Sequence, residues 1–305
     1  MKKIYSLLCL LIVLFFLTGT LYGAEEEQGH LHDEMAHKTE EGEIAELNKE
    51  DKERLLEELM EKSGINRQLE AIPLYIKRGF RTGWAQSGQA RGEALNKSIL
   101  ILGSAFYPGK LQVKIRKAFD IALGADEISD LLQWFDSPLG RAIVSIETDV
   151  FSGASVERKK AMMNQLMQSR QGTVKMERMK RLEKATKATE RAVNMALNME
   201  IAMSMAMLGA FKPSNDEALN ALEKEALTQR PELEKSMEEK ILSGFLYNYR
   251  LLKNNEIEKY IAFSESSYGR KFIETFHMAI TESLTNAGRE AGRAIGEYLK
   301  NKNTR

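Results

Sequence analysis

The sequence predicts an all-α protein. Apolar residues recur at helical spacing along most of the chain, whereas no convincing run of alternating apolar and polar residues occurs. The 305 residues include only five prolines, and 43% of them are hydrophobic, which is enough to build a sizeable core. The 44 basic and 44 acidic residues balance, so the overall charge gives no reason to expect nucleic acid as a partner.

Residues 1–23 have the pattern of a secretory signal peptide. Lys2 and Lys3 precede the apolar run "IYSLLCLLIVLFFLTG", and small residues then lead into an acidic segment. The run is shorter than the roughly 20 residues that span a bilayer comfortably. We therefore expect cleavage and a periplasmic or secreted protein with no stable membrane span, the alternative being an uncleaved anchor. The only cysteine, Cys9, lies in this run, so the mature chain would have no disulfide or thiolate site.

Residues 24–45 form an acidic leader with few apolar residues, and such a composition predicts disorder. The leader contains His30, His32 and His37 together with Asp33. Imidazoles and carboxylates in one flexible segment can chelate zinc, copper or nickel, although no strict ligand spacing is present. A metal ion is therefore the only cofactor that the sequence suggests, and the alternative is that these histidines are incidental.

Helical patterns follow the leader. "NKEDKERLLEELMEKSG" predicts a first helix with Asn48 as its N-cap and Gly64 just past its end. A second helix is expected from about Ile65, with Pro73 as a kink. "LNKSILILGSAF" and "KLQVKIRKAFDIALG" predict two more, separated by a Tyr-Pro-Gly turn.

The second part of the chain is also helical. From Ser137 the pattern continues to about Phe211, with a break expected near Ser152. "KPSNDE" marks an internal boundary, after which "ALNALEKEALT" and a segment opened by Pro231 predict two further helices.

One motif occurs twice. "DEISDLLQWFDSPLGRAIV" begins at Asp126, and "NEIEKYIAFSESSYGRKFI" begins 129 positions later at Asn255. Each predicts a short helix with Asp126 or Asn255 as N-cap, a sharp turn, and a second helix capped by serine. A glycine three residues after that serine would allow close backbone approach. The paired residues are Glu127 and Glu256, Trp134 and Phe263, Ser137 and Ser266, Gly140 and Gly269, and Arg141 and Arg270.

This repetition predicts two tandem, divergent helical units, residues 46–170 and 171–305. Most of the motif is explained by capping, turning and packing. Arg141 and Arg270 remain candidates for contact with an acid or a ligand.

At these residues the chain resembles a family of exported bacterial proteins, domain of unknown function 2059. Its members carry an acid-rich helix start, an aromatic pair, then Ser-Pro-x-Gly and a basic or amide residue. The first copy matches this pattern, while the second has Ser264 for the second aromatic and Ser267 for the proline. The resemblance implies an all-helical exported domain and brings no known activity.

Three further patterns are candidates for binding. Met195, Met199, Met203 and Met207 recur every four residues, as in a core stripe, an apolar groove or a Cu(I) site. Arg78 and Arg81 interleave with Phe80 and Trp84, a composition that can hold a polyanion or lipid headgroup but also occurs at a plain helix end. Gly288, Gly292 and Gly296 predict close helix packing, within the chain or in a homodimer.

No catalytic constellation is evident. His277 is the one histidine in a predicted folded region, it lies among apolar residues, and no compelling carboxylate pair accompanies it. We therefore expect a non-catalytic exported protein that binds a protein partner, an envelope component or an apolar ligand in a helical groove. A metal-binding protein is the alternative, and an unrecognised hydrolase is a third one.

Overall fold

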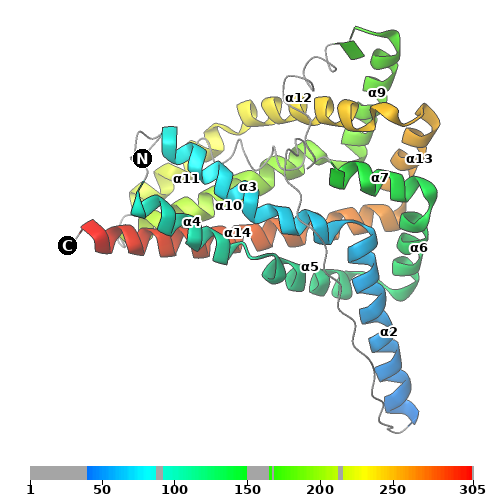
Figure 1. Ribbon diagram of the computed structural model, residues 1–305, viewed down its shortest axis with the longest axis horizontal. Helices are drawn as coiled ribbons and strands as arrows, with labels where there is room; N and C mark the ends of the chain where they lie inside the picture. Colours follow the sequence, from blue (N-terminus) through cyan, green and yellow to red (C-terminus); the bar gives the residue numbers. More distant parts are fainter. Residues whose placement is uncertain (1–39, 87–91, 150–164, 167, 212–215, 304–305) are drawn as a thin grey trace.

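The computed structural model describes residues 40–86, 92–149, 165–166, 168–211 and 216–303 (Figure 1). These residues form α-helices and one short 3₁₀ helix, with no strand among them, which confirms the predicted all-α class. In the described part of the chain, no helix is both long and apolar enough to span a membrane.

The helices fall into two groups along the chain. The first contains α2 (Glu40–Lys62), α3 (Ile65–Gln86), α4 (Glu93–Ala105), α5 (Pro108–Ala122), α6 (Ala125–Asp136) and α7 (Pro138–Asp149). The second contains α9 (Arg170–Thr186), α10 (Ala188–Phe211), α11 (Asp216–Thr228), α12 (Arg230–Asn248), the 3₁₀ helix η2 (Tyr249–Leu251), α13 (Asn254–Glu265) and α14 (Ser267–Asn303).

Corresponding helices of the two groups have corresponding neighbours. In the first group α2 contacts α3, α5 and α6, and in the second α9 contacts α10, α12 and α13. Likewise α3 contacts α4 and α5, while α10 contacts α11 and α12. A residue in the left-handed backbone conformation separates the first two helices of each group: Gly64 with φ 75° in the first and Lys187 with φ 50° in the second. The two groups therefore share their order of helices and these neighbours, whereas the extensive packing of α14 along α10 has no counterpart of similar extent between α7 and α3 among the described residues.

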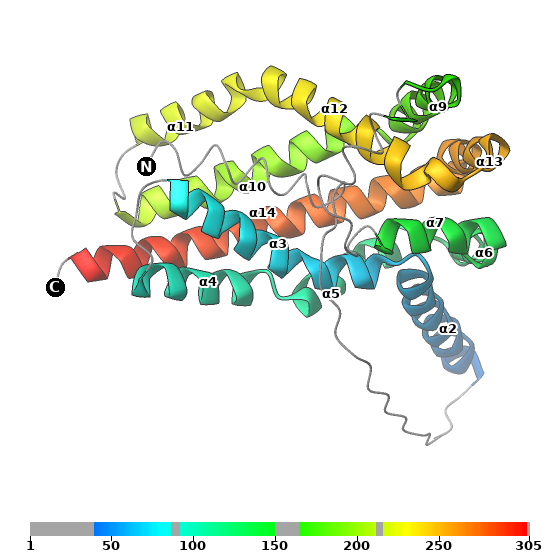
Figure 2. The same ribbon diagram turned by 45° about the horizontal axis from the view of Figure 1, so that its top comes forward.

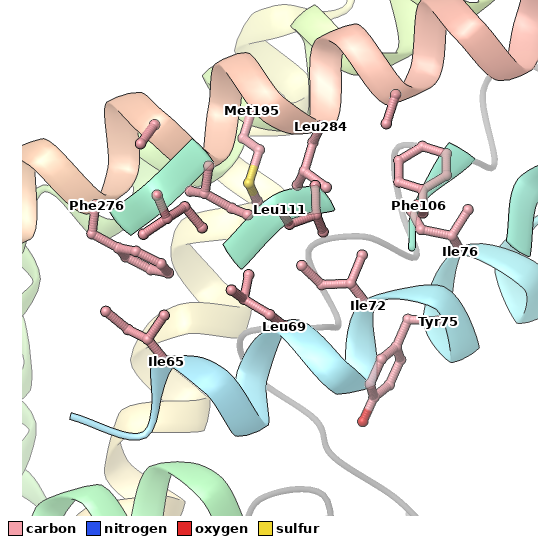
Figure 3. Packing of buried hydrophobic residues seen from close by; sticks show 14 of the residues in the cluster. Ile65, Leu69, Ile72, Tyr75, Ile76, Phe106, Leu111, Met195, Phe276 and Leu284 are labelled. Atoms are coloured by element: carbon pink, nitrogen blue, oxygen red, sulfur yellow. The ribbon is translucent and has the colours of Figure 1, made fainter. Parts of the chain in front are cut away.

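Helix α14 lies at the centre of the molecule. It is 37 residues long and contacts α4, α5 and α6 of the first group as well as α10 and α13 of its own. Figures 1 and 2 show α10 running beside it, and Figure 2 shows α11 and α12 on one side of this pair and α3, α4 and α5 on the other. In Figure 3, Ile65, Leu69 and Ile72 of α3 point toward Phe276 and Leu284 of α14 across the main core.

The methionine stripe and the glycine strip pack against each other. Met195, Met199 and Met203 of α10 are buried, which confirms a core stripe. A Cβ placed on Gly292 of α14 would lie 2.1 Å from the Met203 carbonyl oxygen, so the glycine lets the two backbones meet. A Cβ on Gly288 or on Gly296 would likewise meet α10, at Met199 and Met207 respectively. Because α10 covers this strip, a homodimer through the glycines would require α10 and α14 to separate.

Two repeated corners pack together. The first corner joins α6 to α7 and the second joins α13 to α14. The Gly140 N–H donates to Ser137 Oγ at 2.9 Å, and the Gly269 N–H donates to Ser266 Oγ at 3.0 Å. These serines cap α7 and α14 as predicted. Across the two corners the rings of Trp134 and Phe263 stack, with centroids 4.4 Å apart and planes 5° apart.

Three predicted helix starts are wrong. Helix α2 begins at Glu40, so Asn48 lies inside it and residues 40–45 are helical rather than part of the leader. Strong helix formers such as glutamate, alanine and leucine extend the helix toward its N-terminus. The N-caps of α6 and α13 are Gly124 and Lys253 instead of Asp126 and Asn255.

A glutamate explains where α6 and α13 begin. The Gly124 N–H donates to Glu127 Oε2 at 2.9 Å, and the Lys253 N–H donates to Glu256 Oε2 at 2.6 Å. A glutamate at the third helical position that reaches back in this way is one half of a capping box. It fixes the N-cap two residues before Asp126 and Asn255.

Candidate functional site

A cavity of about 190 Å³ lies where the two groups of helices meet. Helices α6 and α7 supply part of its wall, and α10, α12, η2, α13 and α14 supply most of the rest. The lining is mainly apolar and rich in aromatic side chains, namely Trp134, Phe135, Phe245, Phe263, Phe272 and Phe276. The arrangement is that of a small-molecule site, an apolar hollow with a few polar groups.

Corresponding positions of the two groups line this cavity. Ile143 of α7 and Phe272 of α14 lie 129 positions apart, and both contribute to the wall. The stacked pair Trp134 and Phe263 has the same separation and also contributes. The cavity is thus built by the two corners together.

The main polar feature of the cavity is an acidic wall, formed by Glu147 of α7, Tyr249 of η2 and Tyr260 of α13. Glu147 Oε1 accepts hydrogen bonds from both tyrosine hydroxyls, at 2.6 Å from Tyr249 and 2.7 Å from Tyr260. The two tyrosine rings meet edge to face, with centroids 5.8 Å apart. Two donors on one oxygen hold the carboxyl group in place.

Burial dominates the ionisation of the acidic wall. It raises the pKa of Glu147, while the hydrogen bonds from the two tyrosines act in the opposite direction. Burial together with the adjacent Glu147 raises the pKa of Tyr249 and of Tyr260 well above the ordinary value. Among the described residues no lysine, arginine or histidine forms an ion pair with Glu147. The carboxyl group therefore has hydroxyl donors but no countercharge from this part of the chain.

His277 of α14 also lines the cavity. Burial, together with the nearby guanidinium of Arg191, lowers its pKa to about 3. Arg191 itself pairs with Glu274 at 3.7 Å. The imidazole is consequently neutral at physiological pH and can both donate and accept a hydrogen bond.

Glu147, Tyr260 and His277 lie deep in the protein, yet each keeps part of its surface accessible. All three also line the cavity. A molecule in the cavity would therefore meet a carboxyl group, a phenol and an imidazole, with aromatic rings around them.

The structure separates the predicted basic and aromatic residues of α3. Phe80 and Trp84 are buried in the main core, with ring centroids 5.7 Å apart. Arg78 and Arg81 are exposed on the outer face of the same helix. Because the two aromatic side chains are buried and the two arginines are exposed, the four residues do not form one surface for a polyanion or headgroup.

The two predicted arginines lie outside the cavity wall. The Arg141 guanidinium donates to the backbone carbonyl of Asp136 at the end of α6, which gives it a role in capping the first corner. Arg270 is exposed at the start of α14. Of the four methionines in the stripe, Met195 lines the cavity, whereas Met199, Met203 and Met207 pack along the glycine strip.

The predicted metal ligands His30, His32, Asp33 and His37 lie outside the described residues, so this hypothesis stays a prediction. Within the described ranges, no group of three or more histidine, cysteine, aspartate or glutamate residues is placed to hold a metal ion.

Sequence reasoning missed the acidic wall. Glu147 follows Ile143 by four residues, so it lies on the buried face of α7, and this was the available signal. Tyr260 similarly follows the buried Ile257 by three residues. An acid on an apolar helix face indicates either a paired charge or a site.

Comparisons of the chain with models of known protein families, with curated proteins and with solved structures found no match. The resemblance to domain of unknown function 2059 therefore stays a prediction.

Proposed function

We propose that this chain is an exported, non-catalytic binding protein that holds a small, largely apolar molecule in the cavity between its two groups of helices. The observation that carries the proposal is the combination of an aromatic cavity and an acidic wall at one place. Of the three partners expected from the sequence, namely a protein, an envelope component and an apolar ligand, this combination favours the apolar ligand.

The size of the cavity supports a ligand. Protein interiors are close-packed, and voids much larger than a water molecule are few. The cavity of about 190 Å³ has a mainly apolar wall, and a molecule that fills it would remove apolar side chains from water. The same molecule would also contact Glu147, which lines the cavity.

The acidic wall suits binding better than catalysis. Tyr249 and Tyr260 stay protonated at neutral pH, because their pKa values lie well above the ordinary value, and both hydroxyls donate to Glu147. Protonated phenols are poor nucleophiles. The wall thus presents fixed hydrogen-bonding groups, as a recognition site does.

The two groups of helices are, in this proposal, tandem divergent copies of one helical unit. The order of helices, their neighbours and the hydrogen bonds of the two corners support it. Residues 1–23 would direct export, so the ligand would be met in the periplasm or outside the cell.

Binding of a neutral apolar probe tests the proposal. Trp84→Phe leaves Trp134, which lines the cavity, as the sole tryptophan. In this background, N-phenyl-1-naphthylamine should quench Trp134 fluorescence saturably. Ala192→Leu fills the cavity, because Ala192 lines it, and should weaken binding about tenfold or more.

A matched control is available on the same helix. Ala202 is as deeply buried as Ala192, with exposed fractions of 8% and 6%, but it lies outside the cavity wall. Ala202→Leu should keep the affinity for the probe, and the exposed Ala221→Leu serves as a second control. Equal binding by Ala192→Leu and the parent protein, or no saturable binding by the parent, would contradict the proposal.

A further inference from the structure

We infer that the molecule held in the cavity is a hydrophobic amine, whose ammonium group binds Glu147 on the acidic wall while its apolar body lies against the aromatic lining. This inference rests on the proposed function, because it assigns a ligand class to the same cavity.

Unused hydrogen-bonding capacity at Glu147 points to a donor on the ligand. A carboxylate can accept about four hydrogen bonds. The described contacts supply two, both to Oε1, from Tyr249 and Tyr260. Glu147 is partly accessible and lines the cavity. An ammonium group carries donors only, so it complements the remaining acceptor sites.

The lack of a charged partner for Glu147 among the described residues also favours a cationic ligand. A buried carboxylate is stable when a cation lies beside it, and the described residues pair none with Glu147. Arg191, whose charge acts on His277 of the cavity wall, is paired with Glu274. A cationic ligand would therefore supply the countercharge that this part of the chain does not provide.

The aromatic lining favours a cation with an apolar body. The faces of aromatic rings attract ammonium groups when these are within about 6 Å of the ring centre. Tyr260 belongs to the acidic wall, and its ring centroid lies 6.4 Å from that of Phe263, which stacks on Trp134. An amine bound at Glu147 would have these rings beside its charged end and its carbon chain.

The acidic wall occurs in only one of two corresponding places. The position 129 residues after Glu147 is Phe276, and the position 129 residues before Tyr260 is Leu131. Both are buried in the main hydrophobic cluster. The fold thus accepts apolar residues at the two corresponding positions, so packing alone does not explain why Glu147 and Tyr260 are polar.

Three probes with one carbon skeleton test the ligand class. We would measure Trp134 quenching in the Trp84→Phe background by 4-phenylbutylamine, 4-phenylbutanol and 4-phenylbutyrate at pH 7. The amine should bind about tenfold to a hundredfold more tightly than the alcohol, the range expected for one hydrogen bond to a charged group. The carboxylate should bind most weakly, because it would face Glu147.

Substitution of Glu147 tests whether this residue causes the preference for the amine. Glu147→Gln should remove the advantage of the amine over the alcohol while the alcohol binds within about threefold of its affinity for the parent protein. Glu265→Gln, on the exposed end of α13, is the matched control and should change neither affinity. Circular dichroism checks that the variants are folded, and Tyr260→Phe, which keeps the charge, should retain the order of the three probes.

The outcomes separate the two proposals. Equal binding of amine and alcohol, or tightest binding of the carboxylate, would overturn the amine inference and leave the binding cavity standing. No binding of any probe to the parent protein, the neutral apolar probe included, would overturn both. An amine preference that survives Glu147→Gln would place the cation elsewhere and also overturn the inference.

Discussion

The two corners share the serine and the glycine of the turn and differ in several residues that face the cavity. Both hold a serine hydroxyl on a glycine N–H, at 2.9 Å in the first corner and 3.0 Å in the second. Beyond the turn, α7 is 12 residues long and carries Glu147, whereas α14 is 37 residues long and carries Phe276 at the corresponding position.

This difference separates architecture from function. The shared serine and glycine satisfy backbone hydrogen bonds and let two backbone segments approach closely. Any corner of this shape needs such residues, so their presence is explained by structure alone. The differing residues include Glu147 against Phe276 and Thr148 against His277. Three of these four line the cavity. The site therefore lies where the two corners have diverged.

The glycines of the corners give the largest expected effect. A Cβ on Gly140 would lie 2.1 Å from the Trp134 carbonyl oxygen, and one on Gly269 would lie 2.0 Å from that of Phe263. Gly140→Ala and Gly269→Ala should each lower the free energy of unfolding by about 3 kcal/mol, because the backbone must move. Urea unfolding would measure this.

The control for these glycines is Gly209 of α10, where an added Cβ meets nothing within 4 Å. Gly209→Ala should leave stability unchanged or raise it by up to about 1 kcal/mol, as expected for a helix interior. If only one of the two corner variants were destabilised, the corners would not be structurally equivalent.

The sequence predicted the corners better than it predicted the site, and the reason is physical. Ser137, Gly140 and their counterparts act on backbone atoms a few residues away, so local spacing reveals them. The contacts of Glu147 reach across 102 residues to Tyr249 and 113 residues to Tyr260. No local pattern encodes such a contact, because it depends on how α7 packs against η2 and α13.

Packing partners were likewise hidden in the sequence. The methionine stripe predicted a buried face, and the glycine strip predicted close helix packing, but nothing local indicated that each is the partner of the other. Met203 and Gly292 meet only because α10 lies beside α14. Faces of single helices can be predicted from periodicity, whereas pairs of faces require the tertiary structure.

His277 should make the stability of the protein depend on pH, whereas Thr148, the corresponding residue of the first corner, does not titrate. The pKa of His277 is lowered to about 3, with burial as the main cause and Arg191 as the second, against about 6.5 in the unfolded chain. A lowered pKa gives stability that is complete above pH 6.5 and is lost as the pH falls toward 3. By pH 5 the loss should reach about 2 kcal/mol.

His277→Thr introduces the residue of the first corner and should remove this loss between pH 7 and pH 5, as measured by urea unfolding at both values. The pKa of Glu147 is raised, so its protonation favours the folded state at low pH and acts with the opposite sign. The difference between parent and variant isolates the histidine. An unchanged pH dependence in His277→Thr would show that His277 does not titrate on unfolding in this range.

The hydrogen bond from Tyr260 to Glu147 in the acidic wall should contribute less to the free energy of unfolding than the corner glycines or His277. Tyr260→Phe removes one hydrogen bond to the buried Glu147 and should lower the free energy of unfolding by about 1.5 kcal/mol, measured in urea. Tyr107 is 60% exposed, and Tyr107→Phe should change stability by less than about 0.5 kcal/mol. Equal effects of the two substitutions would mean that the Tyr260 hydroxyl adds nothing to the stability of this wall.

The smallest effect concerns an ion pair that only one corner has. Lys271 of α14 contacts Glu127 of α6 at 2.6 Å, whereas the corresponding positions hold Ala142 and Glu256. Ala142 and Glu256 both line an outer hollow of about 600 Å³, which leaves room for a lysine. Ala142→Lys should therefore raise the free energy of unfolding by about 0.5 kcal/mol, as for a partly exposed pair. The gain should vanish in about 1 M salt, because salt screens exposed charges. Ala142→Met is the control, because it adds an unbranched side chain without a charge. If methionine stabilised the protein as much as lysine, or if the stabilisation by lysine persisted in salt, the added contact would be apolar and not the counterpart of the Lys271 pair.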